Sequence, residues 1–336
     1  MGATIRDVAR AAGVGLGTVS RVLNNSPLVS AATRKRVLDV IAELQYTPSQ
    51  IARSFASGKT LTVGTIAPFF TRPSVVERLR GIEATLADNS YDLVVFNVET
   101  VERRDSCLQE VPRRDRTDGV LIISLSLHSE EVATLQSTGV PVVLIDACAD
   151  ELPSVLIDDV RGGELATRHL IELGHRRIAF IGDADDELQA FNFTSTHNRL
   201  QGYLKALEAY GITPRPEYQR FGRHGRYEAR RLACELLQLP ESPTAIFAAS
   251  DTQAMGVLEA ARDLQISVPA MLSVIGFDDI DVAEYLALTT VRQPLFESGV
   301  RGVELLLGAI LGNAQPTREY LPIELVPRAT TARPAP

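Results

Sequence analysis

The sequence has few cysteines, no tryptophan and no long apolar run. Its three cysteines, Cys107, Cys148 and Cys234, lie far apart without Cys-x-x-Cys or Cys/His spacing, which argues against a disulfide framework and a zinc site. Tryptophan is absent, so no indole ring can stack on a ligand. There is no run of about 18 apolar residues, and the charged segment 1–10 lacks a signal-peptide core. We therefore expect a cytoplasmic protein that does not contact a membrane.

The composition is that of a folded protein with more than one domain. Of 336 residues, 45% are hydrophobic and 23% are charged, close to globular averages, and about 150 residues per domain predicts two domains. Residues 1–59 carry eight basic and three acidic side chains, a net charge of +5. Because the net charge of the whole chain is −8, residues 60–336 carry a net charge of −13. A basic N-terminal part on an acidic body suggests that this part meets a polyanion.

Three short helices are predicted in the basic N-terminal part. Thr4 and Asp7 form a capping box, and apolar residues then follow a helical spacing to Ala12. After a glycine turn, a second helix is expected at about 17–23, which completes a helix-turn-helix. Ser30 caps a third helix. The inner face of this helix consists of Val37, Val40, Ile41 and Leu44.

Two glycine-containing segments do not meet the requirements of a nucleotide site. Residues 13–17 follow no strand and lack the Gly-x-Gly-x-x-Gly spacing. Gly58-Lys59-Thr60 resembles the end of a phosphate-binding loop, but the position of the required first glycine holds Arg53. We therefore do not expect nucleotide binding here.

Short β-rich runs alternate with helical segments from residue 61 onward. Predicted strands of the first series are 61–67, 91–98, 119–124 and 140–146, with helices at 75–87 and 103–110. Predicted strands of the second series lie near 177–182, 219–221, 244–248 and 272–277. The alternation is typical of parallel α/β sheets, so we expect two similar lobes. Ligands of such sheets bind at the carboxyl ends of the strands.

Several motifs give the chain a resemblance to the LacI/GalR transcription regulators. Those of the N-terminal part are Thr4-Ile5-Arg6-Asp7-Val8-Ala9, Ala12-Gly13-Val14, Gly17-Thr18-Val19-Ser20-Arg21-Val22-Leu23-Asn24 and Ile51-Ala52-Arg53-Ser54. Those of the body are His169-Leu170-Ile171-Glu172-Leu173-Gly174-His175-Arg176-Arg177-Ile178, Arg199-Leu200-Gln201-Gly202-Tyr203, Val274-Ile275-Gly276-Phe277-Asp278-Asp279 and Glu324-Leu325-Val326. The resemblance covers nearly the whole chain. It implies a small all-α helix-turn-helix DNA-binding domain followed by an α/β two-lobed domain with parallel sheets, like a periplasmic binding protein.

The resemblance implies which residues of the second helix contact DNA in the major groove. Base-contacting positions fall on Leu16, Gly17 and Arg21, and phosphate-contacting positions on Thr18, Ser20 and Asn24. The Arg21 guanidinium can bond guanine O6 and N7, worth about 1–3 kcal/mol of discrimination. Leu16 can touch a thymine methyl, whereas Gly17 allows only close approach.

Residues 48–57 resemble the family's hinge helix, which by that resemblance orders on DNA and inserts an apolar side chain into the minor groove. The family usually has leucine at the inserted position, and this chain has Phe55, a residue type that wedges between base steps. Ala52 and Arg53 are expected to line the same groove. Packing of Phe55 against the body is the alternative.

The resemblance also implies the domain boundaries. It gives a helix-turn-helix domain at 1–47, a hinge and linker at 48–60, and an effector-binding and dimerisation domain at 61–336. The first lobe then spans about 61–160 and 290–322, and the second about 161–289 and 323–330. Three crossings, near 160, 290–295 and 322, join the lobes, and a small effector closes the cleft between them.

Three charged residues match the family's effector ligands. Asp146 and Asp278 follow apolar strands, and Arg199 opens a helix. Carboxylates accept from adjacent hydroxyls while a guanidinium donates to oxygens, so this set suits a polyol. Ser250 stands where many relatives have asparagine, so one amide contact becomes a hydroxyl.

Aromatic side chains near these positions offer stacking faces, although core packing is the alternative for any single phenylalanine. They are Phe69, Phe70, His224 and the segment Phe191-Asn192-Phe193. The predicted effector site comprises Phe70, Asp146, Phe193, Arg199, His224, Ser250 and Asp278.

The sequence gives little support to an enzyme. Paired carboxylates also drive glycoside hydrolysis, but Asp146 and Asp278 are expected to face each other across a mobile cleft. No Gly-x-Ser-x-Gly, His-Glu-x-x-His or Cys/His nucleophile pattern occurs. His169 and His175 are six residues apart, which is not metal-ligand spacing, and both are expected to be structural. We expect no catalysis, no cofactor and no metal.

Together these features predict a DNA-binding transcription repressor. A small carbohydrate effector is expected to shift its affinity for a near-palindromic operator on double-stranded DNA. The leucine heptads that make some relatives tetramers are missing, so we expect a homodimer. The alternative is a cytoplasmic sugar-binding module that acts through a protein partner rather than DNA. Arg21, Asn24, Arg53 and Phe55 count against that alternative.

Overall fold

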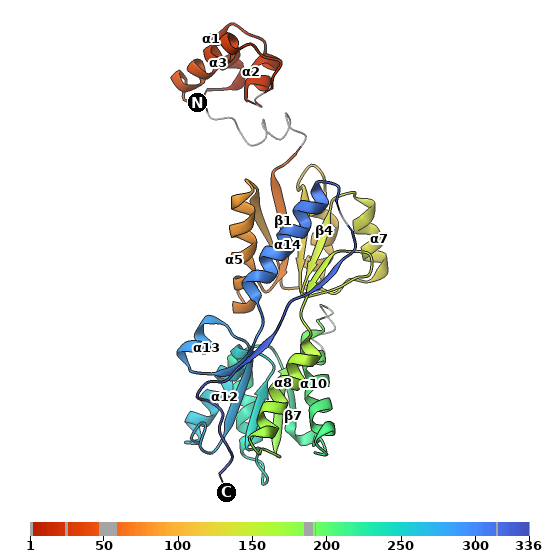
Figure 1. Ribbon diagram of the computed structural model, residues 1–336, viewed down its shortest axis with the longest axis vertical. Coiled ribbons are helices and arrows are strands. Elements are labelled where there is room, and N and C mark those ends of the chain that lie inside the picture. Colours follow the sequence, from red (N-terminus) through yellow and green to blue (C-terminus); the bar gives the residue numbers. More distant parts are fainter. Residues whose placement is uncertain are drawn as a thin grey trace.

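The computed structural model has a small helical head followed by a two-lobed α/β body (Figure 1). It describes residues 3–23, 26–46, 59–184, 191, 193–313 and 315–335, and we call 3–46 the head and 59–335 the body. None of the described helices combines the length and the apolar character that a membrane crossing requires. Four residues that were predicted to contact DNA lie outside the described residues, namely Asn24, Ala52, Arg53 and Phe55.

The head consists of three helices around one small core. They are α1 (Ile5–Ala12), α2 (Leu16–Leu23) and α3 (Ala31–Glu43). The predicted capping box of α1 is confirmed, because the Thr4 hydroxyl accepts from the Asp7 N–H at 3.4 Å and the Asp7 carboxylate accepts from the Thr4 N–H at 3.0 Å. α2 begins one residue before the predicted Gly17.

The packing of α3 holds the end of α2 in place. Val19 and Val22 of α2 are buried against Val37 of α3 and the apolar side of α1. Arg34 of α3 donates to the carbonyl oxygens of Val22 at 3.4 Å and Ser26 at 2.6 Å. A cation at the last carbonyls of a helix is favourable, so this arginine stabilises the head.

The first lobe is built on a six-stranded parallel sheet with the order β11-β5-β4-β3-β1-β2. Its strands are β1 (Thr62–Pro68), β2 (Asp92–Val98), β3 (Gly119–Ile123), β4 (Val142–Ile145), β5 (Ser154–Leu156) and β11 (Arg318–Tyr320). One face is covered by α5 (Pro73–Asp88) and α14 (Leu295–Ile310), the other by α6 (Val101–Glu110) and α7 (Ser129–Ser137). Because helices cover both faces of the sheet, every residue of β3 is buried, which explains its continuous apolar run.

The second lobe repeats this design with the order β12-β10-β9-β8-β6-β7, in which only β12 runs antiparallel to its neighbour. Its strands are β6 (Ile178–Asp183), β7 (Gln219–Gly222), β8 (Ala245–Ala248), β9 (Ser273–Asp278), β10 (Thr289–Arg292) and β12 (Glu324–Val326). Its helices are α8 (Asp159–Glu172) and α10 (Ser195–Ala209) on one face, α11 (Arg226–Leu237) and α12 (Asp251–Asp263) on the other, and the short α13 (Asp281–Tyr285) and 3-10 helix Pro216–Tyr218. The predicted fold class is confirmed.

Within the described residues of the body, the chain passes between the two sheets three times. These passages are residues 157–158, between β5 and α8; 293–294, between β10 and α14; and 321–323, between β11 and β12. They agree with the expected crossings near 160, 290–295 and 322. β10 pairs within the second sheet, so that lobe extends to Arg292 and not only to residue 289.

A close helix crossing in the second lobe sets the position of the cleft side chains. α8 and α10 approach so closely at Gly163 that a Cβ there would lie 2.2 Å from the carbonyl oxygen of Arg199. A Cβ at Gly202 would lie 2.1 Å from the carbonyl oxygen of Val160. Only glycine fits such contacts, and they hold the start of α10 against the start of α8.

Candidate functional site

One face of α2 carries the predicted base contacts. Leu16, Gly17 and Arg21 are exposed, while Thr18 and Ser20 are half-buried beside them. Within the described residues the Arg21 guanidinium has no hydrogen-bond or ion-pair partner. This face therefore presents the Arg21 guanidinium, the large apolar side chain of Leu16 and the bare backbone at Gly17 to solvent.

A cavity of about 70 Å³ lies between the two lobes. The described structure brings six of the seven predicted effector residues together around it, Asp146 from the first lobe and five from the second. Those five are Phe193, Arg199, His224, Ser250 and Asp278. The cavity is far smaller than the roughly 300–1,000 Å³ of typical small-molecule pockets, so the lobes are close together and the site suits a compact ligand.

The polar wall residues stand at the carboxyl ends of parallel strands, where ligands of such sheets bind. Ser124 follows β3, Asp146 follows β4, and Asp183 and Asp278 are the last residues of β6 and β9. Ser124, Asp146 and Asp278 have φ values of 56°, 60° and 117°. Positive φ is uncommon outside glycine and concentrates at functional sites. Its occurrence at three strand ends along this edge therefore indicates a functional site.

Arg199 is held in the cleft by several acceptors. Its side chain is 7% exposed, and Nε donates to Asp159 Oδ1 at 2.7 Å while NH1 donates to the carbonyl oxygen of Ala249 at 2.6 Å. NH1 also lies 3.5 Å from Asp278 Oδ1, and the guanidinium carbon is 3.6 Å from the centre of the Phe277 ring. A buried guanidinium needs such partners, so Arg199 is oriented before any ligand arrives.

Burial raises the pKa of both carboxylates beside Arg199. Burial raises the pKa of Asp159 to about 6, against the opposing effect of the Arg199 charge. Burial also raises the pKa of Asp278, again opposed by Arg199 and by the hydrogen bond from Gln293. Asp159, the first residue of α8, was not predicted, because an acidic residue at a helix start is expected there for capping alone.

A second polar cluster in the second lobe centres on Asp183. Its carboxylate accepts from Thr196 Oγ1 at 3.0 Å and Gln253 Nε2 at 2.9 Å, and pairs with His224 Nδ1 at 3.1 Å. Burial raises its pKa, but the bond with His224 and the nearby cations outweigh this effect, so the net shift is downward. The Ser250 hydroxyl caps α12 and contacts Gln253 Oε1 at 3.1 Å, so Ser250 belongs to the same cluster. Asp183 was not predicted from the sequence.

A series of hydrogen bonds and one ion pair joins the first lobe to the second through Gln293, which lies in the crossing segment 293–294. Ser124 Oγ donates to Asp146 Oδ2 at 2.7 Å, and Arg78 NH2 lies 3.2 Å from the same oxygen. Arg78 NH2 also donates to Gln293 Oε1 at 2.9 Å, and Gln293 Nε2 donates to Asp278 Oδ1 at 2.6 Å. Arg78 and Gln293, which the sequence did not reveal, therefore link Asp146 to Asp278.

Three of the predicted aromatic side chains contact one another at the edge of the cleft. The Phe70 side chain is 39% exposed and does not line the cavity, so the structure does not place it with the other six predicted effector residues. Phe69, which was also predicted to offer a stacking face, packs edge-on to Phe191 at 5.3 Å between ring centres, and Phe191 stacks on Phe193 at 5.4 Å. Phe191 is buried in the core of the first lobe although its segment follows β6 of the second. These rings therefore join the lobes at the edge of the cleft.

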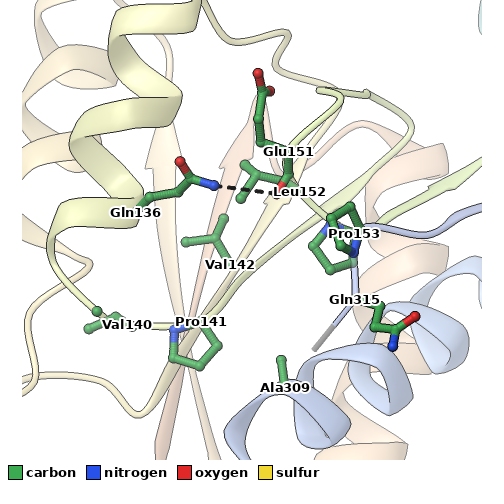
Figure 2. A pocket seen from close by; sticks show the side chains of 11 residues that line it. Gln136, Val140, Pro141, Val142, Glu151, Leu152, Pro153, Ala309 and Gln315 are labelled. Atoms are coloured by element: carbon green, nitrogen blue, oxygen red, sulfur yellow. Dashed lines mark hydrogen bonds between the residues drawn. The ribbon is translucent and has the colours of Figure 1, made fainter. Parts of the chain in front are cut away.

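A larger pocket lies at the other end of the first sheet (Figure 2). Its volume is about 340 Å³, and its walls are mainly apolar, with Val140, Pro141 and Leu152 among them. The hydrogen bond drawn there joins Gln136 Nε2 to the carbonyl oxygen of Glu151 at 3.5 Å. The pocket borders the amino end of β4, away from the charged residues at the carboxyl ends. It lacks the donor and acceptor array of the cleft.

Comparison with known proteins gives two family matches. The bacterial regulatory proteins of the lacI family match residues 4–49, and a periplasmic binding protein-like domain matches residues 167–331. The chain is 36% identical over 334 residues to the ribose operon repressor of Escherichia coli (strain K12), with 97% of both chains covered.

Solved structures resemble the chain along almost its whole length. The lac repressor dimer bound to operator and the anti-inducer ONPF has a TM-score of 0.86 at 28% identity, covering 99% of this chain and 100% of that one. The complex of the transcriptional regulator CelR with cellobiose has a TM-score of 0.72 at 31% identity, covering 98% and 99%.

A helix-turn-helix head joined to a two-lobed binding body defines a DNA-binding transcription regulator. With these matches, the chain belongs to the LacI family of bacterial regulatory proteins. The relatives named above are regulators of transcription, which supports the DNA-binding interpretation over the alternative module that acts through a protein partner.

Proposed function

We propose that this protein is a transcription repressor whose affinity for operator DNA is controlled by a small sugar bound in the cleft. The observation that carries the proposal is the interlobe array of Asp146, Arg199 and Asp278, which offers carboxylates and a guanidinium to one compact ligand. Relatives named for ribose and solved with cellobiose support a carbohydrate. Each polar group of a sugar needs a partner when it leaves water, and this array supplies them.

The proposed domain division follows the sequence boundaries. Residues 1–47 read the major groove, 48–60 form the hinge, and 61–336 bind the effector and a second copy. The proposed DNA contacts are Leu16, Gly17, Thr18, Ser20, Arg21, Asn24, Ala52, Arg53 and Phe55. The exposed face of α2 supports the first part of this set.

The mechanism is a linkage between cleft closure and the hinge. A sugar held by both lobes favours the conformation in which their bonds to it coexist, and it shifts DNA affinity only by its differential affinity for the two states. A tenfold change needs about 1.4 kcal/mol. Asp118 of the first lobe accepts from the N–H groups of Thr60 and Leu61, at 2.7 and 2.9 Å. Movement of that lobe is therefore passed directly to the segment that leads to the head.

We propose a homodimer, which matches a near-palindromic operator by symmetry. β2 is an edge strand of the first sheet, and its Val94 and Val95 are substantially exposed. Val76 on the neighbouring α5 is exposed as well. Exposed apolar groups of this kind fit an interface with a second copy.

The test is selection of bound sequences from random duplex DNA at about 150 mM salt, without sugar and with ribose or cellobiose. We expect a palindromic motif, and a change in its recovery with one of the sugars. The variant Arg21→Ala, selected in parallel, is expected to yield a degenerate motif. Recovery of no motif from the wild type under any condition would contradict the proposal.

A further inference from the structure

Asp279 is a buried carboxylate that directly follows the predicted effector ligand Asp278. Asp278 lines the interlobe cavity, whereas Asp279 does not. The side chain of Asp279 is only 7% exposed, and aspartate is almost never buried to this extent unless it is paired. The partners of this carboxylate therefore indicate what it does.

Two arginines bind the Asp279 carboxylate, one at each oxygen. Arg292 Nε donates to Oδ2 at 2.6 Å, and Arg328 NH2 lies 2.6 Å from Oδ1. Arg292 is the last residue of β10 and precedes the crossing 293–294, which leads into α14 of the first lobe. Arg328 follows β12, the strand into which the crossing 321–323 leads from β11 of the first sheet. One carboxylate therefore holds the second-lobe sides of two crossings.

The loop that follows β9 is held by further bonds. Asp278 accepts from Gln293 Nε2 at 2.6 Å, and Gln293 lies in one of these two crossings. The N–H of Ile280 donates to Asp251 Oδ2 at 3.0 Å. Asp278 and Asp279 adopt φ values of 117° and 58°, and non-glycine residues keep such a backbone only where the surrounding structure fixes it. The loop therefore has little freedom to absorb a displacement of Asp278.

We propose that Asp279 is a positioning residue that carries effector binding at Asp278 to two of the crossings, and through them to the first lobe. A sugar held by Asp278 moves the loop as the lobes close, and the ion pairs of Asp279 move the ends of β10 and β12 with it. Networks of ion pairs and hydrogen bonds are one physical means by which two sites are coupled. The inference rests on the proposed control of operator affinity by a sugar.

The test compares Asp279→Asn with Glu324→Gln, both in the full-length protein. Each substitution removes one negative charge that pairs with Arg292. Glu324 lies on β12, its side chain is 62% exposed, and it accepts from Arg292 NH1 at 2.5 Å. Glu324→Gln therefore controls for a weakened ion pair beside the crossings, while Asp279 keeps both of its arginines.

The ligands are the operator duplex recovered by the selection described above and one sugar. Ribose, glucose and cellobiose are screened by thermal shift on the wild type, and the sugar that stabilises it is used. The quantity measured is the coupling factor, which is the larger divided by the smaller of the two operator affinities with and without saturating sugar. Calorimetry gives the sugar affinity of each variant without DNA.

We expect Asp279→Asn to lower the coupling factor at least about threefold while its sugar affinity stays within about threefold of the wild type. Glu324→Gln should keep the coupling factor within about twofold. A merely structural role would lower the melting temperature without changing the coupling factor of the folded protein. Arg292→Met, at a side chain that is 47% exposed, provides a second variant should Asp279→Asn not fold, and a smaller coupling factor is expected for it as well.

Four outcomes contradict the account at different levels. A wild-type coupling factor in Asp279→Asn overturns the role of Asp279 and leaves the sugar control standing. Equal losses of coupling in Asp279→Asn and Glu324→Gln also overturn it, because any weakening of the Arg292 pairs would then be enough. Loss of sugar binding by Asp279→Asn without DNA would assign Asp279 to the binding site and not to the connection. A wild type whose operator affinity no sugar changes overturns the proposed function, and the role of Asp279 falls with it.

Discussion

The two functional surfaces of this chain present their charged groups in opposite ways. On α2 of the head, Arg21 is exposed and has no partner within the described residues. In the cleft, Arg199 and Asp278 are more than nine-tenths buried and bonded to other groups of the protein. The surface on α2 leaves its arginine in water. The cleft instead holds its charged groups in hydrogen bonds and ion pairs with other protein groups.

The difference fits what each surface is proposed to bind. DNA brings its own negative charge to a wet interface, so a lone arginine on a helix needs no internal partner. A cleft that excludes water must neutralise its charges with protein groups, because an unpaired buried charge is strongly unfavourable. Substitutions in the head should therefore change recognition alone, and those in the cleft should change stability as well.

Arg199→Met is expected to have the largest effect. It leaves Asp159 and Asp278 buried without their main cation, which should lower the free energy of unfolding by about 3–5 kcal/mol. Urea unfolding measures the loss. The control Arg230→Met removes an exposed arginine that pairs with Asp263, and should cost below about 1 kcal/mol. Equal losses for the two variants would refute the structural role of Arg199.

Gly163→Ala tests the helix crossing that positions Arg199. The added methyl would meet the Arg199 carbonyl oxygen, and overpacking of this kind costs about 1–3 kcal/mol. The control is Gly308→Ala in α14, where nothing lies within 4 Å of the new Cβ, so the helix should gain about 0.5–1 kcal/mol. Thermal unfolding separates the two. Similar melting temperatures would show that α8 and α10 have room to move apart.

Arg21→Ala should affect recognition without affecting stability. Loss of a bidentate base contact lowers discrimination at one operator base pair by about 1–3 kcal/mol, while the free energy of unfolding stays within about 0.5 kcal/mol. Competition binding with single-base operator variants measures the discrimination. Arg10→Ala, which removes an exposed charge from α1, is the control and should leave the base preference unchanged. An unaltered preference in both variants would remove Arg21 from base reading.

Gly17→Ala is expected to have the smallest effect and to separate stability from recognition most cleanly. A Cβ at Gly17 meets nothing within 4 Å, so alanine should stabilise α2 by about 0.5–1 kcal/mol. If Gly17 serves close approach to DNA, operator affinity should fall despite that gain. A rise in both melting temperature and operator affinity would argue against close approach at this residue.

The elements that the sequence predicted are those with a clear hydrophobic pattern. The exposed face of α2 follows from helical periodicity, and long buried strands such as β3 and β9 follow from their apolar runs. The strands β5, β10, β11 and β12 were missed, and three of them, β5, β11 and β12, have only three residues each, too few to show a pattern.

The sequence analysis named some of the cleft residues and missed others. Asp146 and Asp278 were named because they match the family's effector ligands and follow apolar strands, whereas Arg78 lies inside an amphipathic helix, where an arginine is normally solvated. Phe69 and Phe70 were both named as stacking faces, because the sequence does not show which of two adjacent rings packs against other residues. In the structure Phe69 packs on Phe191, whereas Phe70 is 39% exposed.

The most direct test of the central claim is the reciprocity of the two sites. Calorimetry should give the affinity for the effector sugar with and without saturating operator duplex, and operator affinity should be measured with and without saturating sugar. The account predicts that the sugar affinity changes with DNA by the same factor by which the operator affinity changes with sugar. A sugar affinity that DNA leaves unchanged would contradict control of the head by the cleft.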